Sequence, residues 1–174
     1  MFEELIKKSC FSEDAAEREE AAKNLELLYH CEIRCTQIDP SVLFAHHARG
    51  CTIVAAKICK GVVIYQNVTM GSNMKYNKVS QEWENIGSPI ISENVIVCDG
   101  AKILGPVIIG ANSVIAAGAI ITKDIPMNSV AYGINQYRPR DRNYDLVYRS
   151  DSPDAKRIDE ANKKLIAKFQ ARNG

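Results

Sequence analysis

The sequence has almost no excess of charge of either sign. Its 22 Lys and Arg residues are balanced by 21 Asp and Glu residues, which leaves a formal net charge of +1. Without a basic surplus, nothing in the composition favours nucleic acid or an anionic membrane as a partner. The first ten residues, MFEELIKKSC, also lack the apolar stretch of a secretory signal peptide. We therefore expect a cytoplasmic protein that does not bind nucleic acid.

The cysteines lack the spacing of a metal site. There are six of them, with no CxxC pair and no histidine at a zinc-ligand distance along the chain. They occupy positions 10, 31, 35, 51, 59 and 98. We therefore expect no metal cofactor, and thiols that stay reduced in the cytoplasm.

A genuine membrane span is also missing. Residues 103–121 carry no charge and have the hydropathy of a span. However, Pro106 and the glycines at 105, 110 and 118 interrupt this stretch, and its apolar residues recur every six positions. The hydrophobic core of a β-structure explains the segment, so we expect no membrane span.

What the sequence does contain is a repeat of six residues over positions 91–126. Its hexads are ISENVI, VCDGAK, ILGPVI, IGANSV, IAAGAI and ITKDIP. The first position is always Ile or Val, and the fifth is always small or β-branched. An α-helix would repeat near 3.6 residues and an ordinary strand near 2. A period of six predicts a parallel β-helix, in which each repeat is one short strand and a corner.

Less regular hexads precede these. They run over residues 38–49 and, after a slip of two residues, from Thr52 to residue 75. A polar segment with the only tryptophan, residues 73–88, then interrupts the pattern and is predicted to be a loop that leaves the β-helix.

The flanking segments complete the predicted organisation. Residues 1–31 form an N-terminal helical segment, with a helix from about Ser12 to His30. Residues 32–136 form the β-helix domain, and residues 137–174 form a basic tail and a final helix that begins at Ser152–Pro153. One face of that helix carries the apolar residues Ile158, Ala161, Leu165 and Phe169.

Three segments resemble the left-handed β-helix acetyltransferases of the serine acetyltransferase type and their galactoside and polysaccharide O-acetyltransferase relatives. These segments are residues 64–71 (IYQNVTMG), 100–105 (GAKILG) and 122–126 (TKDIP). The resemblance covers about residues 32–140. It implies a mainly β fold, a left-handed parallel β-helix, and a homotrimer with acetyl-coenzyme A in grooves between adjacent β-helices. It also implies a histidine base facing each groove.

Such a base takes the proton of an acceptor hydroxyl and returns it to the leaving thiolate, and histidine suits both steps because its ordinary pKa is ~6.5. Aligned without gaps, the family's catalytic histidine falls on His46. A shift of one residue gives His47 instead, followed by Ala48 and Gly50 as in the family's His-Ala-x-Gly. We favour His46. The alternatives are His47 as the base, or both histidines as plain turn residues, and we expect His30 to be structural.

In the serine enzymes an acidic residue orients the base. Glu32, in the segment Glu-Ile-Arg, matches that residue only if one position is deleted before Gln37. Glu32 is therefore a candidate third catalytic residue, with Asp39 as a weaker one and a solvated glutamate as the alternative.

The resemblance also implies coenzyme A contacts. In the galactoside-type relatives the contact positions align with Asp99, Ala117, Thr122 and Lys123. Cations suited to the nucleotide phosphates are Lys123, Arg138, Arg140 and Arg142, although Arg138 and Arg142 equally suit an ordinary charged surface. The amide that follows Gly71 is a candidate oxyanion donor, because the family's Gly-Gly is Gly-Ser here.

Two departures bear on the acceptor. Ser88 stands before Pro89, where the serine enzymes carry a substrate-holding histidine, and only about thirty residues take the place of their long N-terminal helical domain. We therefore expect an O-acetyltransferase whose acceptor is a sugar hydroxyl, such as that of a surface-polysaccharide precursor. Serine O-acetylation is the enzymatic alternative, and a non-catalytic hexapeptide scaffold is the alternative from another class.

Overall fold

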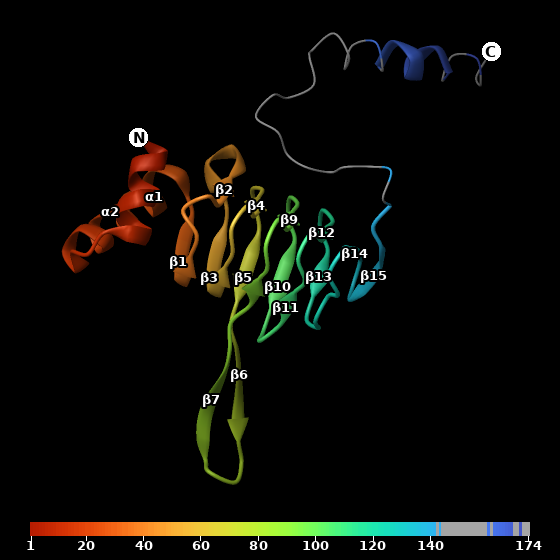
Figure 1. The fold of residues 1–174 in the computed structure, drawn as a ribbon. Helices are drawn as coiled ribbons and strands as arrows, with labels where there is room; N and C mark the ends of the chain where they lie inside the picture. The colour runs from red at the N-terminus through yellow and green to blue at the C-terminus, as the bar shows by residue number, and fades with distance from the viewer. Residues whose placement is uncertain (142, 144–159, 161, 169–170, 172–174) are drawn as a thin grey trace.

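The computed structural model describes residues 1–141, 143, 160, 162–168 and 171. Two helices lead into a solenoid of short strands, and one hairpin leaves its side (Figure 1). The elements before the hairpin are α1 (Phe2–Phe11), α2 (Ala15–Tyr29), β1 (Glu32–Ile38), β2 (Leu43–Phe44), the 3₁₀ turn η1 (Ala45–Ala48), β3 (Thr52–Ile58), β4 (Val63–Ile64) and β5 (Thr69–Gly71). The hairpin is β6 (Asn73–Asn77) and β7 (Glu82–Gly87). The elements after it are β8 (Ile90–Ile91), β9 (Ile96–Val97), β10 (Lys102–Leu104), β11 (Ile108–Ile109), β12 (Val114–Ile115), β13 (Ile120–Ile121), β14 (Ser129–Tyr132) and β15 (Gln136–Pro139).

The strands stack into three faces of parallel ladders. Face 1 holds the first half of β1 and β3 with β5, β10 and β13, and Ile53, Met70 and Ile103 are in register on it. Face 2 holds the second half of β1 and β3 with β8 and β11. Face 3 holds β2, β4, β9, β12 and β14. Each turn of the chain visits the three faces in order, which is a parallel β-helix, as the six-residue repeat predicted.

The repeat positions form the core of this β-helix. The first residue of every hexad from Ile91 to Ile121 is 0% exposed. The fifth positions are equally buried, and the one polar residue among them, Ser113, bonds through its hydroxyl to the carbonyl oxygen of Pro126 at 2.9 Å. Burying an Ile or Val side chain contributes about 1.5–3 kcal/mol, so the stacked first positions are the main source of stability.

One predicted hexad is wrong by a residue. Thr52 is exposed, and Ile53 takes the buried first position in register with Met70. The cause lies in the preceding corner, where η1 contains residues in left-handed conformation and lengthens the path from Phe44 to Ile53. Adjacent Thr and Ile are both compatible with a strand, so the pattern did not fix the register here.

The N-terminal helices close one end of the solenoid (Figure 1). Phe2, Ile6 and Leu25 belong to the same buried cluster as the β-helix core. Helix α2 covers most of the helix predicted from Ser12, but its N-cap is Asp14, whose carboxylate accepts a hydrogen bond from the amide of Ala16 at 2.8 Å. Its C-cap is His30, in the left-handed conformation.

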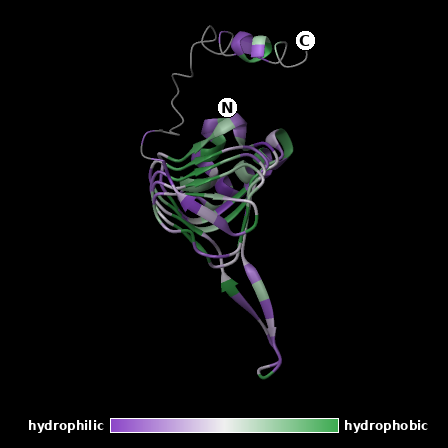
Figure 2. Ribbon diagram, turned by 90° about the vertical axis from the view of Figure 1, so that its right-hand side faces the viewer, coloured by the Kyte–Doolittle hydropathy of each residue, from purple (hydrophilic) through white to green (hydrophobic). Residues whose placement is uncertain are grey.

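Residues 73–88, predicted to be a loop, form the antiparallel hairpin β6–β7. It projects sideways from the coils in both views (Figures 1 and 2). The beginning of the predicted basic tail is also a strand, because β15 pairs antiparallel with β14. Sequence reasoning missed both strand pairs because neither follows the six-residue period.

The final helix is described only in part. Residues 162–168 are helical, and Leu165 among them is 66% exposed. The predicted start at Ser152–Pro153, together with Ile158, Ala161 and Phe169, lies outside the described residues. Within the described part of the chain, no helix combines the length and the apolar character needed to cross a membrane.

Candidate functional site

Four of the predicted site residues share one corner of the β-helix. We name this the histidine corner; it joins face 3 to face 1 and comprises residues 45–51, 65–68, 98–101 and 116–119 of successive coils. His46, His47, Asp99 and Ala117 all belong to it. Because neighbouring strands lie 4.7–4.9 Å apart, the corner runs about 14 Å from the coil of His46 to that of Ala117.

The two adjacent histidines lie in a strained turn. His46, His47 and Ala48 have φ values of 53°, 57° and 51°, three successive left-handed residues without a glycine. Each such residue costs roughly 1–2 kcal/mol, so the surroundings must hold the turn. Ala48 is completely buried, the amide of Gly50 donates to the carbonyl of His30 at 3.0 Å, and the amide of Asn67 donates to the carbonyl of Arg49 at 2.8 Å.

This turn sends the two imidazoles to different surroundings. The ring of His47 packs against Phe2 and Tyr29, at centroid distances of 5.2 and 5.6 Å, and so faces the N-terminal helices. The ring of His46 lies 6.0 Å from Tyr65, the residue that follows β4 in the next coil. His46 is therefore the histidine whose ring lies against the next coil of the corner, the coil before that of Asp99.

Neither predicted acidic partner contacts these histidines. Glu32 pairs with Arg34 at 2.8 Å on face 1. Asp39 accepts from the hydroxyl of Ser41 at 2.6 Å and from its amide at 2.8 Å, which lowers the pKa of the Asp39 carboxyl. Within the described residues, no hydrogen bond or ion pair joins an imidazole to a carboxylate.

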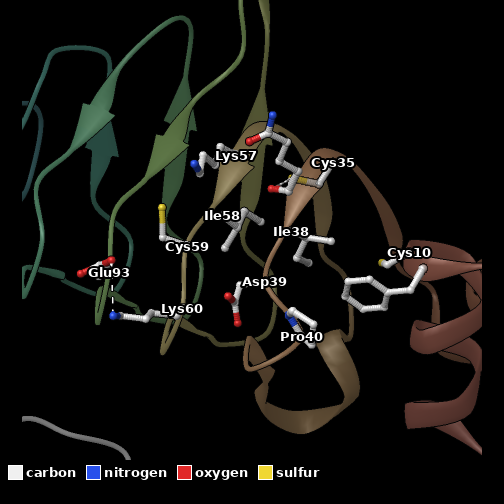
Figure 3. Close-up of a pocket in the computed structure, with 12 residues that line it drawn as sticks. Cys10, Cys35, Ile38, Asp39, Pro40, Lys57, Ile58, Cys59, Lys60 and Glu93 are labelled. Atoms are coloured by element: carbon white, nitrogen blue, oxygen red, sulfur yellow. Dashed lines mark hydrogen bonds and ion pairs between the residues drawn. The ribbon is translucent and has the colours of Figure 1, made fainter.

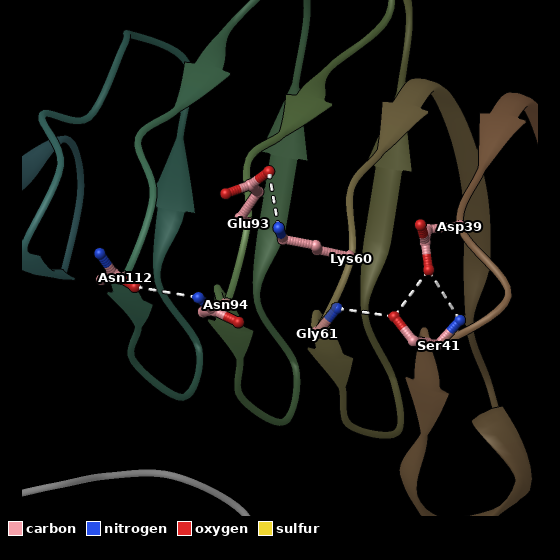
Figure 4. A network of polar contacts seen from close by, with 7 residues as sticks. All are labelled: Asp39, Ser41, Lys60, Gly61, Glu93, Asn94 and Asn112. Carbon is pink, nitrogen blue, oxygen red and sulfur yellow. Dashed lines mark hydrogen bonds and ion pairs between the residues drawn. The ribbon is translucent and has the colours of Figure 1, made fainter.

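Asp39 instead belongs to a structural network at the corner between faces 2 and 3 (Figure 4). The hydroxyl of Ser41 accepts from the amide of Gly61 at 2.9 Å, which links the first coil to the second. Further along, Lys60 pairs with Glu93 at 3.7 Å, and Asn94 donates to Asn112 at 3.2 Å. This ladder of contacts ties successive coils together and leaves Asp39 no role at the histidine corner.

A second group of predicted residues lies at the corner between faces 1 and 2. The carbonyl of Gly71 accepts from the amide of Gly105 at 2.8 Å, and the hairpin leaves the β-helix directly after it. Thr122 exchanges two hydrogen bonds with the side chain of Asn135, at 2.7 and 2.8 Å. The side chain of Lys123 is exposed beside it. Strand β5 separates this corner from the histidine corner by about 10 Å, at 3.2–3.4 Å per residue.

The predicted phosphate-binding arginines do not lie together at either of these two corners. The amide of Arg140 donates to Asn128 at 2.8 Å, and its guanidinium donates to the carbonyl of Asn112 at 3.2 Å, so Arg140 lies at the corner between faces 2 and 3. Arg138 lines a cavity of about 440 Å³ with Ala116, Val130 and Tyr132, which continues the histidine corner into the last coil. Arg142 lies outside the described residues. One chain therefore distributes the predicted site over three corners.

Sequence reasoning missed two residues of the histidine corner. Tyr65 contacts His46, and the amide oxygen of Gln66 is buried without a hydrogen-bond partner among the described residues. A buried acceptor without a partner is uncommon, and a bound ligand that donates a hydrogen bond to the Gln66 oxygen would explain it. Both residues lie inside the matched segment 64–71, so the resemblance marked the place without assigning them a role.

Another cavity lies away from this corner, between the end of α1 and face 2 (Figure 3). It has a volume of about 560 Å³, and Cys10, Cys35 and Lys57 line it. Burial raises the pKa of the Cys10 thiol to about 11, so this thiol stays protonated at neutral pH. Among the described residues, no three His, Cys, Asp or Glu side chains are grouped to hold a metal ion.

Comparison with known proteins identifies the repeat. Residues 88–123 match the family model of the bacterial transferase hexapeptide (six repeats). A putative serine acetyltransferase of Schizosaccharomyces pombe is 41% identical over 92 residues, which cover 52% of this chain and 32% of that protein. The serine acetyltransferase of Mycobacterium tuberculosis is 33% identical over 116 residues, or 66% of this chain and 47% of that protein. The chain thus spans less than half the length of these relatives.

Two solved structures with a similar fold are also serine acetyltransferases. The soybean apoenzyme matches 71% of this chain and 49% of its own, with a TM-score of 0.56 at 26% identity. A serine acetyltransferase in complex with coenzyme A matches 71% of this chain and 48% of its own, with a TM-score of 0.54 at 22% identity. The predicted left-handed β-helix and the resemblance to the serine acetyltransferases are therefore confirmed over the coils.

Proposed function

We propose that this chain, a hexapeptide-repeat β-helix similar to the serine acetyltransferases, is an acetyl-coenzyme A-dependent O-acetyltransferase that acts on the hydroxyl of serine. The histidine corner carries the proposal, because it presents the exposed imidazole of His46 at the start of a corner whose last coil is lined by small residues. The sequence alone favoured a sugar acceptor. The relatives of 30% identity or more named above are serine acetyltransferases, which favours serine instead.

In the proposed reaction His46 is the general base. Its imidazole takes the proton of the serine hydroxyl while the hydroxyl oxygen attacks the thioester carbonyl carbon, and a tetrahedral oxyanion forms. When the carbon–sulfur bond breaks, the imidazolium returns the proton to the thiolate. The products are O-acetylserine and coenzyme A. The backbone amide after Gly71 is the proposed donor to the oxyanion.

The last coil of the histidine corner suits the long arm of coenzyme A. Ala116, Ala117 and Gly118 are small, and a methyl group added at Gly118 would meet no atom within 4 Å, so this part of the corner is open. An arm lying along the corner would pass Asp99 and reach the cavity lined by Tyr132 and Arg138. The guanidinium of Arg138 suits a phosphate there.

The proposed enzyme is a homotrimer. In a single chain the amide after Gly71 and His46 lie at the two different corners that bound face 1, too far apart to act on one carbonyl. A neighbouring β-helix that presents its Gly71 corner to the histidine corner brings the two together. Exposed apolar side chains support such packing: Leu104 is 38% exposed, Ile108 49% and Ile120 38%.

A sugar hydroxyl is the second candidate acceptor. Trp83 is 66% exposed on the hairpin and lies 5.5 Å from Tyr76, edge to face, so two aromatic rings are available to stack on a sugar. Ser88 in place of the histidine of the serine enzymes supports the same candidate.

Labelled acetyl-coenzyme A, offered with serine, simple sugars and nucleotide sugars, tests the proposal. We expect label on serine. Label on a sugar alone would replace serine with the second candidate. Transfer to no acceptor, together with no binding of coenzyme A, would favour the non-catalytic scaffold.

A further inference from the structure

We propose that His47 is a positioning residue for the reaction, an inference that depends on the proposed function. Its ring, packed between the N-terminal helices and the β-helix, fixes the left-handed turn of residues 45–48 and thereby aims the imidazole of His46 along the histidine corner. The chemistry belongs to His46, and the contribution of His47 is the packing of its ring.

The first observation is a cluster of three rings. Phe2 and Tyr29 meet edge to face at 5.0 Å, and the imidazole of His47 lies at 5.2 Å from the first and 5.6 Å from the second. Phe2 is only 4% exposed and belongs to the hydrophobic core, so the core holds one ring of this cluster in place. The two helices thus hold the turn through a side chain as well as through the bond from Gly50 to His30.

The second observation is the backbone of the turn. His46, His47 and Ala48 are all left-handed, a conformation that non-glycine residues keep only when their surroundings impose it. Ala48 is fixed from the inside, where it is completely buried. His46 and His47 are exposed, and for these two the ring cluster is the restraint that the helices supply.

The third observation is that His46 lacks the usual means of orientation. A catalytic imidazole is commonly held by a carboxylate, but the described residues offer it no such bond: Glu32 is paired with Arg34, and Asp39 bonds to Ser41. The direction of the His46 imidazole then follows from the backbone of the turn. A displacement of 1 Å in a catalytic group can cost on the order of 100-fold in rate, so a loosened turn lowers kcat.

Four variants and one control test whether the ring of His47 positions His46. His47→Ala and Tyr29→Ala remove a ring from the cluster, whereas His47→Phe and Tyr29→Phe keep it. Leu27→Ala is the control, because Leu27 lies on the same helix and is 72% exposed. We expect both Ala variants to lower kcat on the order of tenfold with KM for both substrates unchanged. Both Phe variants and the control should stay within twofold of the parent.

Hydrogen exchange at residues 44–51 supplies a readout that does not require activity. We expect faster exchange there in His47→Ala and Tyr29→Ala, and the parent rate in the Phe variants. Loss of activity in His47→Phe at the parent exchange rate would overturn the proposal, because the imidazole itself would then be needed. Unchanged exchange in both Ala variants would also overturn it.

Failure of the proposed function gives a different result. A parent protein that transfers acetyl groups to no acceptor refutes the function, while the exchange rates still decide whether the ring cluster holds the turn. Where His47→Phe does not fold, the Tyr29 pair makes the same comparison with His47 intact.

Discussion

The rings of His46 and Tyr65 lie 6.0 Å apart, on successive coils of the same corner. His47, one residue further along the chain, faces the opposite way, toward Phe2 and Tyr29. The left-handed turn that contains both therefore gives different surroundings to two histidines, of which the sequence alone favoured His46. This relationship predicts a much larger loss of activity for substitution of His46 than for substitution of His47.

Removal of the His46 imidazole should abolish most of the transfer. We expect His46→Ala to lower kcat by about two to four orders of magnitude, the range for loss of a general base. Calorimetry should show that coenzyme A still binds, because His46 takes part in proton transfer only. His47→Ala is the matched comparison, with a much smaller loss. The reverse order of the two effects would make His47 the base.

The protein should be a trimer in solution. In a single chain the Gly71 corner lies too far from His46 to complete the proposed site, and a neighbouring chain would supply the missing corner. Light scattering should give about three times the 19.3 kDa of one chain at micromolar concentration. A monomer mass would refute the proposed site between chains.

Trp83 should bind either the acceptor or a neighbouring chain. If its exposed ring contacts the acceptor, Trp83→Ala should raise the KM for the acceptor severalfold, since an aromatic contact contributes about 0.5–1.5 kcal/mol beyond its buried area. Assembly and coenzyme A affinity should not change. Val79→Ala, at the exposed tip of the same hairpin, is the control. A Trp83 variant that dissociates into monomers, with a normal KM in the remaining trimer, would assign the ring to assembly.

Two glycines of the β-helix should differ in their tolerance of alanine. At Gly110 the new methyl group would overlap the backbone of Pro126 and Met127 in the next coil, which cannot move without opening the stack. We expect Gly110→Ala to lower the free energy of unfolding by about 3 kcal/mol or more. At Gly118 the space is open and only the φ of +67° opposes a side chain, so Gly118→Ala should cost about 1–2 kcal/mol. Urea titration compares the two, and equal losses would contradict the packing argument.

Stability should fall at alkaline pH. Burial, with a smaller contribution from a neighbouring thiol, raises the pKa of Cys10 and of Cys31 from 9.0 to about 11. In the unfolded chain these thiols ionise near pH 9, so above that pH ionisation favours unfolding. The stabilisation is complete below pH 9 and is lost progressively up to about pH 11.

Replacement of both cysteines tests whether their thiols cause the loss of stability above pH 9. The double variant Cys10→Ala, Cys31→Ala should lose less stability than the parent between pH 9 and pH 11, whatever its stability at pH 8. Parallel curves of the unfolding free energy against pH would show that these two thiols do not cause the decline.

The sequence by itself determined the β-helix. A buried Ile or Val at every sixth position is sufficient, because each coil pairs with the next through backbone hydrogen bonds and needs only a repeated apolar residue inside. Residues 91–126 keep this period without a gap, so their core positions were predictable one by one. The resemblance of residues 64–71 likewise marked the coil that lies over His46.

Only the tertiary structure decided where the period fails and what the exceptions do. The register at Ile53, the strand pairing of β15 and the hairpin at residues 73–87 depend on contacts that no local period encodes. The directions of His46 and His47 depend on a left-handed turn that is unfavourable for its own residues. That turn persists because Ala48 is buried in the core and the helices pack against His47, and both contacts come from segments distant in the sequence.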